Sequence, residues 1–310
     1  SNAVSAAENI GPPVATRFTP NSPVGFSTTT DVGTQFGSTF DGVTTFDSQA
    51  YMVPPGGNTR ERNRGRAIFA GGVASPYKDI QVVDISSGGI AQDFGETTTA
   101  AATSGSASSS TRMLVTVGGT PAVVNTIEFV TIANIASSTD FGDLTEPRRR
   151  TQSLSNSTRA VHVGGTSASP ASLYRNEIDF NTIATTGNST DFGDTLSAHV
   201  ATGGSVASST RGVYSAAFVS GSYVNTLEFI TIATTGNGQD FGDLNGGTIG
   251  YHHRGSTCDS TRGLFSGGYN PLGQVQNKID FITIASTGNA TDFGDLSVAR
   301  RSGAGTANSI

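Results

Sequence analysis

The phrase "DFGDL" at residues 140–144 is repeated at 240–244 and 292–296, with close copies, "DFGE" and "DFGDTL", at 93–96 and 191–196. The aspartates that open the phrases are 47, 51, 49 and 52 residues apart. Asp-Phe-Gly marks a magnesium ligand in protein kinases, but the glycine-rich loop, strand lysine and catalytic-loop phrase of kinases do not occur in this sequence. A period of about 50 residues is typical of repeat architectures. We therefore interpret the phrase as a structural element used once per unit.

Two further phrases recur around it. One is a strand that ends in a glycine pair, as in "STRGLFSGG" (260–268) and "STRAVHVGG" (157–165). The other is an apolar, β-branched run, as in "NKIDFITIA" (277–285), followed by the Gly-Asn turn "STGN" (286–289). No segment shows a helical period, so each unit is predicted to be a small antiparallel sheet of about four strands.

The run "NKIDFITIA" carries apolar side chains on both alternating faces, such as Phe281 on one and Ile282 on the other. A strand that is apolar on both faces needs cover on both. Sheets stacked face to face around an axis provide that cover. The sequence therefore predicts an all-β fold, a five-bladed β-propeller with four-stranded blades over residues 59–310.

The order of glycine pair, aliphatic strand and outer aromatic resembles kelch repeats over roughly residues 60–310. The outer aromatic is Phe where kelch repeats usually have Trp, at Phe94, Phe141, Phe192, Phe241 and Phe293. The wording "NTIEF", "TIA", "TGN", "DFGDL" and "STRG" is similar to kelch-like repeats in structural or tail-associated proteins of marine bacteriophages. That resemblance implies a virion component; the sequence otherwise leaves the localisation open.

The two ends of the chain differ from the units between them. Residues 299–309 are predicted to form the inner strand of the first blade, since this closes the ring and removes two sheet edges. A sixth, degenerate blade within residues 20–58 is the alternative. Residues 1–58, which begin with "SNA" like the remnant of a cleaved tag, are otherwise predicted to be an extended arm, either laid on the propeller or used for assembly with other subunits.

Composition excludes several classes of function. The net charge of −6 gives no general attraction to nucleic acid, and no apolar run is long enough to span a membrane. A single cysteine, Cys258, cannot form an internal disulfide. No cofactor or metal site is predicted, because the adjacent His252 and His253 would point to opposite faces of a strand.

One arginine per unit is predicted to play a structural role, by tying its blade to an acidic group of the same or the next blade. The candidate acids are Glu128, Asp179, Glu228 and Asp280. The repeated arginines are Arg66, Arg112, Arg159, Arg211 and Arg262.

Departures from the repeat point to the candidate ligand site. The stretches at 147–152, 197–201, 251–255 and 299–303 all precede an inner strand, so they should meet at one mouth of the channel. Guanidinium groups, which donate paired hydrogen bonds, and the face of a tyrosine ring would suit an anionic or sugar ligand there. A solvated rim would have the same composition. The candidate residues are Arg148, His199, Tyr251, His252, His253, Arg254, Arg300 and Arg301. The variable turns after the glycine pairs, 165–175, 220–224 and 268–276, are further places for recognition.

Three functions remain open at this point. The first is a non-enzymatic binding or structural module that recognises a protein or glycan. The second is a lectin with one sugar site per blade, built on the uniform "TTGN" turns. The third, a glycoside hydrolase, needs two carboxylates across the site, and the inner strands offer only Glu146 and Asp259. We therefore expect a protein that is not an enzyme.

Overall fold

The computed structural model describes residues 66–71, 78–84, 90–100, 105–118, 122–167, 173–200, 203–245 and 253–301. All of them belong to the unit Arg66–Ile310, which is compact by itself. The predicted arm, and the alternative sixth blade within it, lie outside the described residues.

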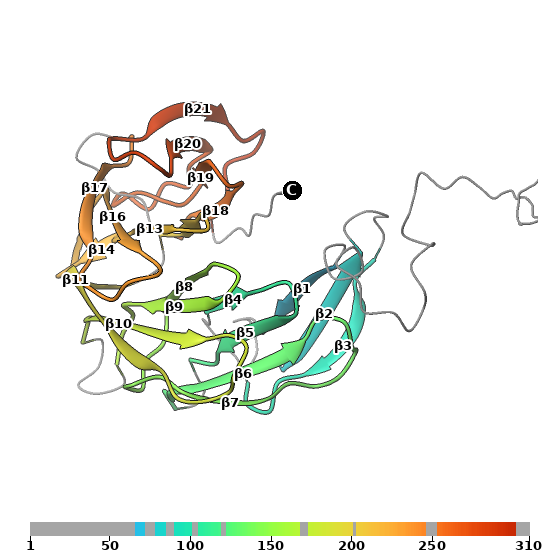
Figure 1. The fold of residues 1–310 in the computed structure, drawn as a ribbon. Coiled ribbons are helices and arrows are strands. Elements are labelled where there is room, and N and C mark those ends of the chain that lie inside the picture. The colour runs from blue at the N-terminus through green and yellow to red at the C-terminus, as the bar shows by residue number, and fades with distance from the viewer. Residues whose placement is uncertain are drawn as a thin grey trace, which may run out of the picture. The chain divides into compact units, whose positions relative to one another are not determined.

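The described residues form antiparallel sheets in the order of the repeat (Figure 1). The first sheet has β1 (Arg66–Ala70), β2 (Asp79–Asp84) and β3 (Gln92–Glu96). The second has β4 (Gly105–Ser108), β5 (Arg112–Thr116), β6 (Thr126–Thr131) and β7 (Thr139–Asp143). The third has β8 (Gln152–Ser155), β9 (Arg159–Val163), β10 (Arg175–Thr182) and β11 (Thr190–Val200).

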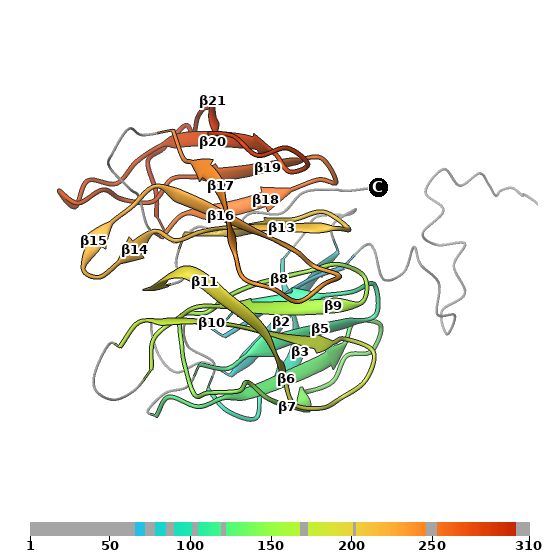
Figure 2. The same ribbon diagram turned by 60° about the vertical axis from the view of Figure 1, so that its left-hand side comes forward.

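The fourth sheet has β12 (Ser205–Ala207), β13 (Arg211–Ser215), β16 (Thr226–Thr231) and β17 (Gln239–Asp243). The fifth has β18 (Gly255–Cys258), β19 (Arg262–Ser266), β20 (Lys278–Thr283) and β21 (Thr291–Asp295). A short hairpin, β14 (Phe218–Val219) and β15 (Ser222–Tyr223), leaves the fourth blade and extends the third sheet beyond β11 (Figure 2).

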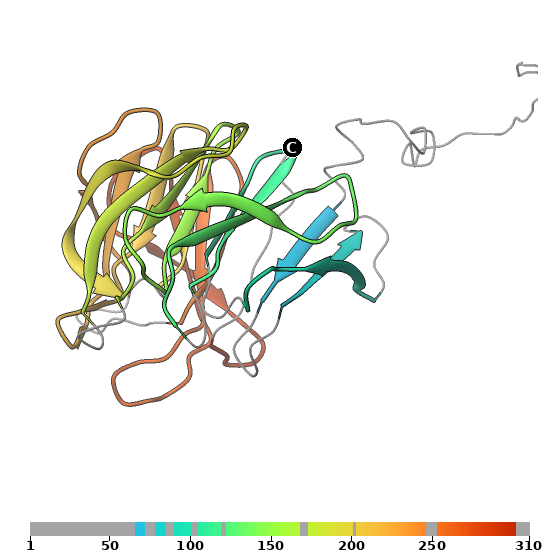
Figure 3. The ribbon, with the colours of Figure 1, turned by 90° about the horizontal axis from the view of Figure 1, so that it is seen from below.

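The five sheets stack face to face around a common axis, so this part of the chain is a five-bladed β-propeller (Figure 3). Apolar side chains of neighbouring blades form the core between them. Ile80 and Phe94 of the first blade, for example, pack with Met113 and Val130 of the second.

The Asp-Phe-Gly phrase lies on the outer strand of each blade, where it has two structural roles. Its glycine faces a β-bulge and has a positive φ, 142° at Gly142, which side chains rarely adopt. Its phenylalanine is at most 2% exposed at Phe94, Phe141, Phe192 and Phe241. Phe293 differs from the other four, since half of its surface (50%) is exposed.

The inner strands are built mostly from small residues, because these strands approach one another at the axis. Their hydroxyls join neighbouring blades: Ser155 Oγ donates to Ser108 O (2.8 Å) and Ser256 Oγ to Ser205 O (2.9 Å). Residues of β1, β4, β8, β12 and β18 line one cavity of about 520 Å³.

Closure of the ring by residues 299–309 stays a prediction. Within the described part, β1 pairs with β2 alone. Residues 299–301 are not part of a strand, and residues 302–309 lie outside the described residues.

Candidate functional site

The repeated arginines tie each blade to the next, but through carbonyl groups rather than acids. Arg159, for example, stacks its guanidinium over Phe180 of its own blade, 4.1 Å from the ring centroid, and donates to Ile232 O of the next blade at 3.0 Å. Bonds to the next blade are also formed by Arg66, Arg112 and Arg211, while stacking over a Phe is also seen for Arg112, Arg211 and Arg262.

The predicted acidic partners are therefore wrong, for a geometric reason. Arg112 faces Thr131 in the ladder, whereas Glu128 faces Val115, three positions further along the strands. The guanidinium also points outward to the next blade, where strand ends offer free carbonyl oxygens.

Three of the buried acids instead bind the segment that follows the Asp-Phe-Gly phrase of the preceding blade. Asp179 accepts from the Thr145 backbone N–H (3.0 Å) and hydroxyl (2.8 Å). Glu128 accepts from Thr98 N (3.1 Å), and Glu228 from Leu196 N (3.3 Å). These contacts give the acids a structural role between blades.

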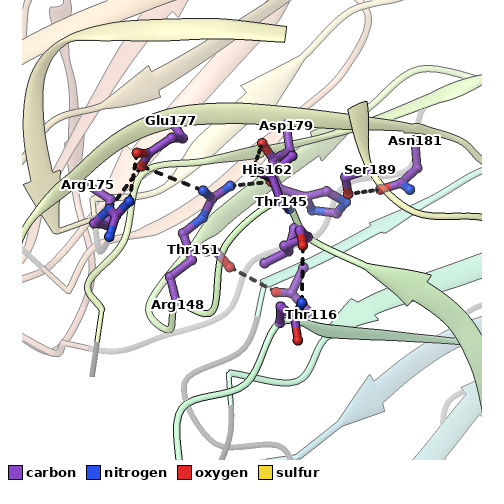
Figure 4. Close-up of polar contacts among 12 residues, drawn as sticks. Thr116, Thr145, Arg148, Thr151, His162, Arg175, Glu177, Asp179, Asn181 and Ser189 are labelled. Carbon is purple, nitrogen blue, oxygen red and sulfur yellow. Dashed lines mark hydrogen bonds and ion pairs between the residues drawn. The ribbon is translucent and has the colours of Figure 1, made fainter. Parts of the chain in front are cut away.

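Two arginines predicted for the mouth are buried in ion pairs. Arg148 has no exposed side-chain surface, and its Nη2 lies 2.9 Å from Asp179 Oδ2 (Figure 4). Arg254 Nη1 lies 2.8 Å from Asp280 Oδ2, while its Nη2 donates to Phe265 O. Burial lowers the pKa of Arg148, against the opposing effect of Asp179. Neither guanidinium can reach a ligand at the mouth.

His199, also predicted for the mouth, is likewise buried. Its Nδ1 lies 2.9 Å from Ser197 O, and its ring stacks on Tyr214 with centroids 6.2 Å apart. Burial lowers the pKa of His199, so the ring is neutral at pH 7. His199 therefore packs the interface between the third and fourth blades.

Of the remaining predicted residues, His253, Arg300 and Arg301 lie at the fifth blade. His253 stacks on Tyr269 with ring centroids 5.8 Å apart, and Arg301 places its Cζ 4.9 Å from the same ring. Arg300 is exposed and turns its Nε toward Val298 O (3.4 Å). Tyr251 and His252 lie outside the described residues.

From Tyr269 a continuous row of rings crosses the loops of three blades. Successive centroid distances are 5.8 Å from His253 to Tyr269, 6.5 Å to Tyr223, 5.0 Å to Phe218 and 6.1 Å to Tyr174. All five rings are half-buried. We call these residues, His253, Tyr269, Tyr223, Phe218 and Tyr174, the aromatic row.

The fold fixes the row through short backbone pairings. The β14–β15 hairpin carries Phe218 and Tyr223 and pairs with the end of β11, where Val200 faces Phe218. Tyr174 and Tyr269 each sit in an isolated antiparallel bridge, with Thr166 and Val275 respectively. The row is therefore held by strand-like contacts although its residues belong to loops.

Backbone strain gathers around the same rings. Within the described ranges, the non-glycine residues with positive φ are Arg150 (60°), Ala217 (52°), Ser220 (49°) and His253 (59°). Ala217 and Ser220 flank Phe218, and His253 is part of the row. Such conformations cost about 1–3 kcal/mol each and cluster at functional sites, which favours a role for this face.

Apolar side chains are exposed beside the row, on the same loops. Leu173 is 50% exposed, Leu272 79% and Val275 42%. The sequence indicated these loops as places for recognition but not the tyrosines within them, because the departures from the repeat that pointed to a ligand site were mainly charged residues. The available signal was one tyrosine in each of three variable loops.

The uniform Gly-Asn turns, on which a per-blade sugar site would depend, are used between blades. The asparagine side-chain oxygen accepts the backbone N–H of the second aspartate of the preceding blade's phrase, in Asn188–Asp143 (3.1 Å), Asn237–Asp194 (3.1 Å) and Asn289–Asp243 (2.9 Å). These polar atoms are already satisfied by the protein.

Comparison with known proteins adds no assignment: no family model matches the chain, and no curated protein is detectably similar to it. In the described part, no three His, Cys, Asp or Glu residues come close enough to hold a metal ion. The same ranges contain no helix able to cross a membrane.

Proposed function

We propose that the chain is a non-enzymatic docking module that binds another protein through the aromatic row. The observation that carries the proposal is the row itself, five rings in contact across the loops of three blades. Tyr and Arg dominate the energetics of protein interfaces because they bury large areas at low entropic cost.

The surroundings of the row favour a protein partner over a sugar. Leu173, Leu272 and Val275 expose aliphatic surface next to the rings. Contiguous exposed apolar surface with a polar rim is typical of protein–protein contacts. A sugar, whose rim consists of hydroxyls, would leave these aliphatic groups without an apolar partner.

The two alternatives have less support. A lectin with one site per blade would use the Gly-Asn turns, whose asparagine oxygens are bonded within the protein. A glycoside hydrolase would use Asp259, but its Oδ1 accepts from the N–H groups of Thr261 and Arg262, both at 2.7 Å. That aspartate closes a turn at the base of its strand pair.

The proposed setting is a virion or its tail, which rests on the resemblance of the repeats to those of bacteriophage structural proteins. In that setting residues 1–58 would serve assembly with other subunits. A propeller that presents one rigid loop surface suits such a component, because docking then costs little ordering of the chain.

The test is a parallel selection on immobilised protein, with a surface-displayed library of random peptides and with a glycan array. We expect peptides to be enriched, and their binding to be lost in Tyr223→Ala and Tyr269→Ala. A matched control is Tyr214→Phe, a buried tyrosine outside the row. Enrichment of glycans alone, or peptides that ignore both row variants, would refute the proposal.

A further inference from the structure

We infer that the end of the aromatic row at Tyr269 is a receptor for an acidic side chain of the partner, bound by Arg301 and by Arg150 near His253. This inference rests on the proposed function, since it names the chemistry of the partner at that surface.

Two exposed arginines, Arg150 and Arg301, carry charges that act on His253. Arg301 lies over Tyr269, and His253 stacks on that same ring, so Tyr269 connects them. Arg150 comes from the third blade, yet it lies close enough to act on His253. Desolvation first, and then the charges of Arg150 and Arg301, lower the pKa of His253. The histidine thus presents a neutral ring between two cations at pH 7.

Arg150 and Arg301 differ from the three arginines that form ion pairs in the described part. Arg148, Arg175 and Arg254 have carboxylate partners within 2.9 Å. The described residues provide no ion pair for Arg150 or Arg301, although the protein carries 24 acidic residues against 18 basic ones. A local cationic site on an acidic protein attracts an anionic partner and orients it.

Arg150 and His253 share the same unusual backbone conformation. Arg150 and His253 each precede the first residue of an inner strand by two positions, and their φ values are 60° and 59°. Both values lie in the left-handed region, which glycine adopts more readily than other residues. Since glycine would adopt this conformation without strain, the presence of Arg and His there needs a reason beyond folding.

The carboxylate is expected on a peptide because the receptor continues into apolar surface. Val275 and Leu272 lie on the loop that carries Tyr269 and are exposed. An acidic residue followed by aromatic or aliphatic residues would pair with the arginines and cover this loop together. A charged group in that position also fixes the register of the partner on the row.

The experiment uses the peptides selected on the full-length chain. We expect them to carry net negative charge, and to bind about tenfold more weakly to Arg150→Glu and to Arg301→Glu. Their binding should also weaken as salt is added. The control Lys78→Glu makes the same change of charge at an exposed cation of the first blade, which carries no ring of the row, and should leave affinity unchanged.

The outcomes separate this inference from the proposed function. Peptides that need Tyr223 but are neutral, or that bind Arg150→Glu and Arg301→Glu as well as wild type, would overturn the acidic receptor and leave the docking surface standing. Equal weakening by Lys78→Glu would also overturn it, because the effect would then come from overall charge. Binding of polygalacturonate, lost in both arginine variants, with no peptide enriched would overturn both.

Discussion

At the scale of single residues, the third blade shows how polar groups are buried for structural reasons. Arg148, Asp179 and Glu177 form one connected set, with Arg175 at its exposed end (Figure 4). His162 lies beside it, fully buried, with its Nδ1 2.9 Å from Ser153 Oγ. A buried imidazole next to a guanidinium cannot take up a second positive charge without large cost.

His162 should therefore make stability depend on pH. Burial, and then the charge of Arg148, lower its pKa from 6.5 to about 3. Below pH 6.5 the unfolded chain binds a proton that the folded chain excludes, so the free energy of unfolding falls as pH drops toward 3. The slope is roughly 1.4 kcal/mol for each pH unit.

The measurement is urea unfolding between about pH 7 and about pH 4, for wild type and for His162→Phe. Phenylalanine is the residue that faces the buried acid at this position in the fifth blade, Phe265. We expect the free energy of unfolding of the variant to fall less steeply as pH drops. The difference in slope should correspond to about one proton. Parallel curves for the two proteins would show that His162 is protonated in the folded state.

At the scale of elements, the contact between neighbouring blades depends on glycine in the outer phrase. A Cβ on Gly242 would lie 2.5 Å from Gly288 O of the next blade, and Gly142 and Gly193 face Gly187 and Gly236 in the same way. The repeated glycine thus serves the bulge within one blade and close approach to the next. The stacked arginines and the Gly-Asn turns form their contacts at this same interface between blades.

Gly242→Ala should be more destabilising than Gly288→Ala. Both residues have a positive φ, 137° and 150°. A substitution to alanine therefore introduces backbone strain at both positions. No described atom lies within 4 Å of a Cβ at Gly288, so that variant is the matched control. The expected difference is about 1–3 kcal/mol, or about 2–4 °C in Tm for each kcal/mol. Equal Tm values would mean that the interface between the two blades accommodates the added methyl group without loss of stability.

Also at this scale, the sequence predicted more of the fold than of the site. The spacing of "DFGDL" and the strands that are apolar on both faces predicted the propeller, because packing between blades constrains every unit alike. Arg148 precedes its inner strand by four residues and Arg254 precedes its own by one, yet both reach the equivalent acid. Position in the repeat therefore did not decide which side chains point outward.

At the scale of the whole molecule, the row could not be predicted because its rings come from loops about 50 residues apart. No local pattern signals that Tyr174, Phe218 and Tyr269 share one surface. That depends on the angle between blades and on the hairpin that crosses from the fourth blade to the third. The exposure of Phe293 belongs to this scale too, since it marks the blade whose next neighbour is the first.

Ring closure gives a prediction for the whole propeller. Ending the chain after Arg301 should remove the inner partner predicted for β1, so the β1 amides that point away from β2 should exchange faster with solvent. Amides of β9 and β13 serve as an internal control. Unchanged protection of β1 would contradict closure by residues 302–309 and favour the alternative of a further unit within residues 20–58.

The most direct test of the central claim is a crystal structure of the chain with one of the selected peptides. A five-bladed propeller with a single docking surface predicts one peptide per chain, lying along Tyr174, Tyr223 and Tyr269 with a carboxylate between Arg150 and Arg301. Peptides at equivalent positions on several blades, or one bound in the central cavity, would contradict the account.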